Sequence, residues 1–241
     1  MDDRQPEAKL NSFTAARPIA LQVRVRSPLS RWVTEFDHEL KLLEQAYRNA
    51  IAEMLTDRAY LTSEGSGLDQ EASAGVPHDV GTDELDQYFQ QRDVDISGWL
   101  YDIDTTVRLI TEAFIIALWH FWERRLLRAP AGDKTRDEKG QYAHCKSFAW
   151  LKDNGCAPDG RQLGELKLLA ETLKHHFGKC SRELYERRPD LFIEFDAERI
   201  EPSSYQLDMT PQRFDEYLDV VRRSGPINSK AVGYVNKPKI R

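Results

Sequence analysis

Two adjacent histidines near the end of a predicted helix are the residues best suited to acid–base chemistry. His175 and His176 follow Lys174, and Gly178, a residue type that commonly ends helices, comes two positions later. The unpaired carbonyls of a last helical turn favour a protonated imidazole, and Glu171, four residues before His175, favours it further. A histidine that titrates near neutral pH can act as a general acid or base. The alternative is that the Lys-His-His cluster only caps the helix C-terminus.

Basic side chains close to these histidines are candidates for binding phosphate or RNA. They are Lys174, Lys179 and Arg182. Glu183 and Glu186 interleave with them, so a solvated face of mixed charge is the alternative interpretation.

The helix that carries the histidines has apolar residues on two sides. One stripe, at steps of three and four residues, must face the core; it consists of Leu163, Leu166, Ala170, Leu173 and Phe177. Leu168 and Leu169 lie away from that stripe, beside the histidines. We expect them to form the interface of a two-fold homodimer. The alternative is that the C-terminal helix of the same chain covers them.

Other constellations predict neither a metal nor a cofactor. His120 can pair with Glu123 three residues later, although a buried imidazole with one hydrogen bond is the expected state. The sequence has no C-x-x-C pair, and its spacings fit no zinc finger or knuckle; the possible ligands are His144, Cys145, Cys156, His175 and Cys180. Glycine-rich phosphate-binding motifs and the G-x-S-x-G elbow are also missing, which excludes the simplest nucleotide-binding and α/β-hydrolase assignments.

The bulk composition is that of a globular protein. The chain has 241 residues, of which 40% are hydrophobic and 31% charged, and its net charge is −6. A negative balance argues against a domain that coats nucleic acid, although a local basic patch remains compatible with RNA contact. Three cysteines and the lack of a signal segment predict a cytoplasmic location. The longest apolar run, residues 113–122, is too short to span a membrane.

Periodicity predicts an all-α fold, a bundle of five or six helices. The two long helices are expected at 31–57 and 100–128 as an antiparallel pair, and shorter ones at 141–153, 159–178, 181–188 and 211–225. Residues 62–82, rich in Gly, Ser and acids, are expected to be a mobile loop, and 19–26 alternate like a short strand. The predicted organisation is a polar lead-in (1–30), one helical domain (31–225) and a basic tail (226–241).

The order of these helices resembles the HEPN family of prokaryotic toxin–antitoxin and antiviral systems. The resemblance covers about residues 31–192. Its motifs are Phe148-Ala-Trp-Leu151, then Asn154-Gly155, then Leu168-Leu-Ala-Glu-Thr-Leu-Lys-His-His-Phe-Gly178. In active members, the resemblance implies, an Arg-x4–6-His motif from two subunits forms a metal-independent RNA-cleaving site. The family's histidine falls on His175, or on His176 after a shift of one residue. The arginine position falls on Leu169, Ala170 or Glu171, and none of these is an arginine.

Three functions are therefore open. The first expectation is a HEPN-like protein of a prokaryotic defence or toxin–antitoxin type, a degenerate nuclease fold that acts by binding RNA or a partner protein. The second is an active ribonuclease that uses His175 or His176 with an arginine from elsewhere, such as Arg182. The third is a structural protein-interaction subunit without a nucleic-acid role.

Overall fold

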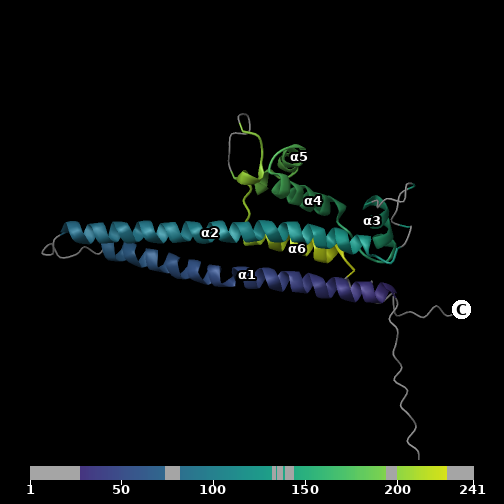
Figure 1. Ribbon diagram of the computed structural model, residues 1–241, viewed down its shortest axis with the longest axis horizontal. Helices are drawn as coiled ribbons and strands as arrows, with labels where there is room; N and C mark the ends of the chain where they lie inside the picture. The colour runs from purple at the N-terminus through teal and green to yellow at the C-terminus, as the bar shows by residue number, and fades with distance from the viewer. Residues whose placement is uncertain are drawn as a thin grey trace, which may run out of the picture.

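The protein folds as an all-α bundle of six helices, as predicted. A computed structural model describes residues 28–73, 82–131, 134, 138, 144–193 and 200–226. The helices are α1 (Pro28–Ser73), α2 (Thr82–Leu127), α3 (His144–Asp153), α4 (Gly160–His175), α5 (Lys179–Arg187) and α6 (Pro211–Ser224) (Figure 1). Within those described ranges there is no strand, and one antiparallel bridge joins Phe192 to Leu207. The predicted strand and nearly all of the lead-in and tail lie outside the described residues.

The two long helices form an antiparallel hairpin, and each has 46 residues, or about 69 Å of helix. Large side chains join them near the base of the hairpin, where Phe36 of α1 packs against the rings of Phe121 and Trp122. Polar contacts fix the register. The Trp32 indole donates to the Arg125 carbonyl over 2.9 Å, and the Tyr47 and Thr111 hydroxyls are 3.0 Å apart. The hairpin is therefore the frame on which the shorter helices are mounted.

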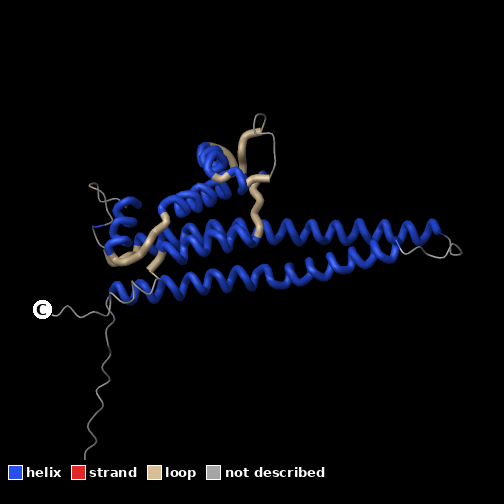
Figure 2. Tube along the Cα trace, turned by 180° about the vertical axis from the view of Figure 1, so that it is seen from behind, coloured by secondary structure: helices blue, strands red, loops and turns tan. Residues whose placement is uncertain are grey.

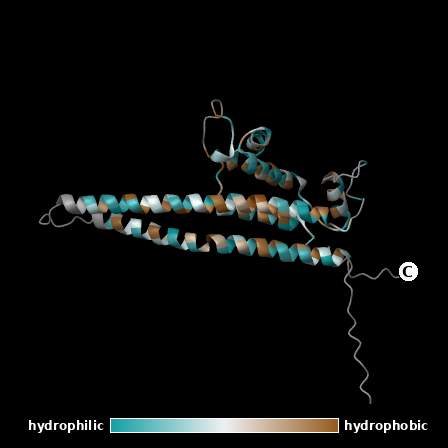
Figure 3. Ribbon diagram, viewed as in Figure 1, coloured by the Kyte–Doolittle hydropathy of each residue, from teal (hydrophilic) through white to brown (hydrophobic). Residues whose placement is uncertain are grey.

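Helix α6 packs against the base half of this hairpin and completes its core. The ring of Phe214 lies 3.9 Å, centroid to centroid, from that of Tyr47, and Tyr217 and Val221 are fully buried. Ion pairs from Arg48 to Asp215 and from Arg222 to Glu44 join α6 to α1. The most hydrophobic stretch of α2 is in the half that faces the shorter helices (Figure 3), which explains why the bundle forms there.

Helix α4 lies across the other side of α2 and packs against α2, α5 and α6. Its start was predicted correctly: Asp159 is the N-cap, and its carboxylate accepts a bond from the Gln162 amide over 3.0 Å. Glu165, buried on α4, pairs with Arg188 at the end of α5, and Arg188 also pairs with Glu216 of α6. This ion cluster links the three short helices.

The distal half of the hairpin projects beyond all other helices, and we call residues 53–73 and 82–104 the arm (Figure 2). The prediction of a mobile loop at 62–82 was wrong for Thr62–Ser73, which continue α1 as helix, and α2 begins at 82 rather than 100. The two helices pair along the arm. Ile96 is buried beside Gly65, and Arg92 forms an ion pair with Glu64. Residues 74–81 lie outside the described ranges.

In the part of the chain that the structure describes, no helix combines the length and apolar content needed to cross a bilayer.

Candidate functional site

Helix α4 ends at His175, three residues before the predicted end at 178, and this separates the two histidines. His175 is the last helical residue, while His176 is the C-cap, where its φ of 63° lies in the left-handed region. The His176 amide donates to the Thr172 carbonyl over 2.8 Å and so closes the helix. Gly178, expected at this cap, instead precedes α5 as its N-cap. The chain therefore leaves α4 at His176.

The ring of His176 contacts the segment that leads toward α6. Its Nδ1 lies 2.6 Å from the Ser204 hydroxyl, and its carbonyl accepts a bond from the Ser204 amide over 3.0 Å. The ring also stacks on Tyr205, with centroids 5.3 Å apart and planes inclined by 8°. A left-handed backbone is unfavourable for a residue with a side chain, so these contacts offset that strain. We interpret His176 as a docking residue between two segments.

His175 and Lys174 share a single acid. Glu171 accepts a bond from Lys174 Nζ over 2.7 Å, and its other oxygen lies 3.4 Å from His175 Nε2. The bond from Lys174 is the main cause that holds the pKa of Glu171 below its usual value. The His175 side chain points into solvent and is 69% exposed. The charged group that contacts His175 is thus a carboxylate, which would repel an RNA phosphate.

The remaining cationic candidates lie on α5 among acids. Arg182 forms an ion pair with Glu201 over 2.8 Å, and the neighbouring Arg187 pairs with Glu183 over 2.6 Å. Lys179 is exposed beside them. The structure therefore brings Lys179 and Arg182 together on one helix, but as part of a surface of mixed charge.

The predicted interface residues are not on the surface, and that prediction requires correction. Leu168 is 9% exposed and Leu169 is fully buried, because α4 is enclosed by α2, α5 and α6 of the same chain. The core stripe was predicted correctly for its first four members, but Phe177 is more than half exposed because the helix ends before it. These leucines leave no apolar face of α4 for a second copy.

Two other candidates also differ from expectation. His120 is exposed, 3.8 Å from Glu123, rather than buried as a core imidazole. The cysteines are free thiols, and burial raises the pKa of Cys156 to about 11. The described residues contain no group of three metal-ligating side chains.

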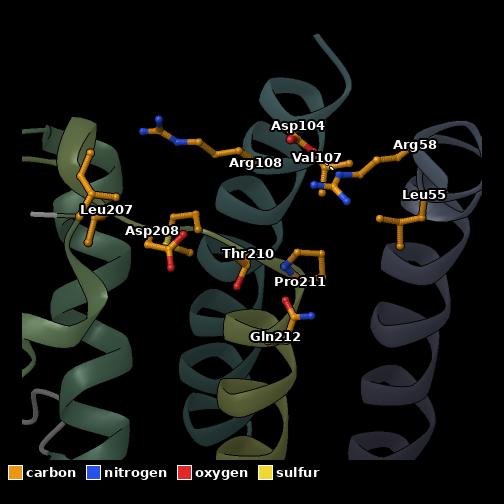
Figure 4. Close-up of a pocket in the computed structure, with 12 residues that line it drawn as sticks. Leu55, Arg58, Asp104, Val107, Arg108, Leu207, Asp208, Thr210, Pro211 and Gln212 are labelled. Carbon is orange, nitrogen blue, oxygen red and sulfur yellow. Dashed lines mark hydrogen bonds and ion pairs between the residues drawn. The ribbon is translucent and has the colours of Figure 1, made fainter. Parts of the chain in front are cut away.

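A cavity of about 480 Å³ lies at the root of the arm, where the segment before α6 meets the hairpin (Figure 4). Both arginines that line it are bound to neighbouring groups. Arg58 pairs with Asp104 across the hairpin over 2.6 Å, and Arg108 pairs with Glu112 and donates to the Ser204 carbonyl. The cavity therefore belongs to the junction that fixes the arm to the body of the protein.

A feature that sequence analysis missed is the surface of the arm itself. Large hydrophobic side chains along it are exposed to solvent: Leu55, Tyr60, Tyr88, Val94, Trp99 and Tyr101. A pocket of about 370 Å³ between the two helices is lined by Asp57, Tyr60, Leu61, Trp99, Asp102 and Ile103. The α1 half of this pocket, Asp57–Leu61, lies just before the predicted loop, and the α2 half lies at the predicted start of the second helix. No pattern within either helix reveals that these residues meet.

No family model matches the chain, and neither a curated protein nor a solved structure matches it.

Proposed function

We propose that this protein is a non-catalytic interaction subunit that binds a partner protein through its arm. The proposal rests on one observation: half of the hairpin projects beyond the core, and its aromatic side chains are exposed to solvent. Tyr101 is 72% exposed, Tyr60 67% and Trp99 44%. Tyrosine and tryptophan are enriched in the centres of protein–protein interfaces, because a ring buries a large area for few lost rotamers.

The thinness of the arm supports this proposal. In a two-helix hairpin each helix can bury only the stripe that faces its neighbour, so the outer faces stay in water. Ile96 is the one large side chain of the arm, among those described, that is fully shielded. A hairpin of this length that served only the fold would be expected to carry polar residues on its outer faces. The aromatic residues there favour a partner.

The contacts of the candidate histidines support a role without catalysis. His176 is engaged by Ser204 and Tyr205, while His175 lies beside Glu171. Arg182 is the arginine that could replace the missing motif arginine, and it already pairs with Glu201. A HEPN-like origin, and with it a place in a prokaryotic defence or toxin–antitoxin system, is proposed from the resemblance in helix order and motifs.

Site-specific photo-crosslinking in the native host tests the proposal. A benzoylphenylalanine at Tyr101 should crosslink the protein that co-purifies with the wild type. The same probe at Leu127, an exposed residue at the other end of α2, should not. Equal capture at both positions, or no co-purifying protein at all, would refute arm-mediated binding.

The ribonuclease alternative is tested separately by incubation with total RNA. We expect intact RNA from the wild type and from the His175→Ala/His176→Ala variant, after circular dichroism has shown that both are folded. RNA cleavage by the wild type that the double variant abolishes would replace the proposed function with a catalytic one.

A further inference from the structure

The pocket on the arm has an unusual combination of side chains. Each helix contributes one carboxylate, one aromatic ring and one aliphatic group within a turn: Asp57, Tyr60 and Leu61 from α1, and Trp99, Asp102 and Ile103 from α2. The two aliphatic side chains are partly buried between the helices, whereas both rings and both carboxylates reach solvent. The pocket thus has a hydrophobic floor with aromatic and anionic walls.

The carboxylates of this pocket are not neutralised within the described chain. The two arginines of the arm form ion pairs with other carboxylates, Arg58 with Asp104 and Arg92 with Glu64. None of the ion pairs found among the described residues includes Asp57 or Asp102. Two exposed acids on facing helices repel each other, and a cation between them would relieve that repulsion.

The rings add a second attraction for a cation. The guanidinium of Arg92 already lies over the Trp99 ring, 5.7 Å from its centroid. A cation is attracted electrostatically to the face of such a ring, and tryptophan is the strongest aromatic partner. A pocket that combines ring faces with carboxylates therefore matches a lysine or arginine side chain, whose apolar stem can cover the aliphatic floor.

The whole arm, like the pocket, favours a positively charged partner. Residues 53–73 and 82–104 carry twelve Asp or Glu and only two Arg, a net charge of −10, while the whole chain carries −6. Two arms of this charge repel each other, which disfavours a second copy of the arm as the occupant. Nucleic acid and anionic membranes are disfavoured for the same reason.

We infer that the pocket formed by Asp57, Tyr60, Trp99 and Asp102 receives a lysine or arginine side chain from a basic segment of the partner protein. This inference rests on the proposed function and adds the chemical class of the partner. The exposed hydrophobic side chains continue from the pocket toward the tip at Tyr88 and Val94, so the basic segment extends along the arm beyond the pocket.

Intrinsic fluorescence provides a direct test, because Trp99 is the only exposed tryptophan; the other four are Trp32, Trp119, Trp122 and Trp150, all buried. The probe is an octa-arginine peptide, with a Gly-Ser peptide of equal length as the neutral control. At about 50 mM salt we expect a saturable change in Trp99 emission with octa-arginine only. The affinity should fall steeply with added salt, because exposed charges are screened.

A matched pair of variants separates the pocket from general acidity. Asp57→Asn/Asp102→Asn should weaken peptide binding at least tenfold. Glu53→Gln/Asp93→Asn removes the same charge from exposed arm positions outside the pocket and should weaken it less than threefold. Equal loss in both variants, or no saturable binding, would overturn the inference.

Two further outcomes are distinguishable. If octa-arginine fails to bind while Tyr101 still crosslinks a partner, the inference is wrong and the proposed function stands. The chain's own basic tail is the competing occupant, with Lys230, Lys237, Lys239 and Arg241. If Lys230→Gln/Lys237→Gln/Lys239→Gln alone changes Trp99 emission without peptide, the tail occupies the pocket and the inference is also wrong.

Discussion

Gly225, the C-cap of α6, lies with its α-carbon directly against the buried ring of Phe36 at the base of the hairpin. Its φ of −83° is accessible to any residue, so the constraint is space rather than backbone conformation. A β-carbon at this position would overlap the ring, which is itself packed against Phe121 and Trp122. We expect Gly225→Ala to lower the free energy of unfolding by about 1–3 kcal/mol, as overpacking of a tight core does. Urea denaturation measures this change.

Two other glycines provide controls for the same substitution. Gly67 and Gly98 are interior residues of α1 and α2, and a β-carbon at either would meet nothing within 4 Å. Alanine there should raise stability by roughly 0.5–1 kcal/mol, because glycine loses more conformational freedom in a helix. If Gly225→Ala proved as stable as these variants, the α6–α1 packing described above would be incorrect.

Single residues also mark how far the sequence could predict the local structure. The N-cap at Asp159 was predicted because its signal, a short acceptor three residues before Gln162, is contained within one turn. The C-cap at His176 was not, since its left-handed backbone depends on Ser204 and Tyr205, which come 28 and 29 residues later. Contacts of that kind leave no periodic signal in a single sequence.

At the scale of elements, the ion cluster between α4, α5 and α6 depends on one arginine. Arg188 pairs with Glu165, which is 2% exposed, and with Glu216. Removing Arg188 would leave the Glu165 carboxylate buried with only its exposed partner, and breaking a buried pair costs about 3–5 kcal/mol. We expect Arg188→Met to destabilise the protein by this order in thermal or urea unfolding.

Arg161 is the matched control because it pairs with the same carboxylate over 3.1 Å but is 81% exposed. Exposed pairs contribute about 0–1 kcal/mol, so Arg161→Met should have little effect. In the Glu165→Gln background the cost of Arg188→Met should shrink, since no buried charge is left unpaired. Equal costs in both backgrounds would contradict a charge-based role.

The arm shows why sequence analysis mistook helix for loop. Residues 62–73 are rich in Gly and Ser, which are weak helix formers. In the folded protein the Thr62 and Ser66 hydroxyls donate to carbonyls one turn earlier, and Arg92 of α2 pairs with Glu64. Packing against α2 therefore stabilises a segment whose own propensity predicts a loop. Whether this segment is helix or loop is determined by its pairing with a distant segment of the chain. The pocket on the arm depends on the same pairing, so it could not be predicted either.

At the scale of the whole molecule, the arm should be separable from the folded body. A variant that joins Arg58 to Asp104 by a short Gly/Asn turn keeps the ion pair at the arm's root and removes residues 59–103. We expect it to unfold cooperatively and to be shorter by about 30 Å in its maximum dimension, given 1.5 Å per helical residue. Small-angle scattering of both proteins measures this difference.

The body of the deletion variant keeps the contacts that this structure assigns to the core, including Phe36 with Trp122 and Tyr47 with Phe214. Aggregation or loss of the cooperative transition would contradict the separation, because it would mean that the arm contributes to the stability of the core. An unchanged maximum dimension would mean that the hairpin does not project.

The net charge of −10 on the arm makes the molecule an electric dipole, with its negative pole at one end of a hairpin about 69 Å long. A positively charged body that approaches would exert a torque, and the tip would turn toward it before any contact forms. The torque acts over about 30 Å at 0.01 M salt but only about 8 Å at physiological ionic strength. Salt would therefore slow the association of the partner far more than it would speed its dissociation. The reason is that the rings and the aliphatic floor, which hold a bound side chain, are little affected by screening.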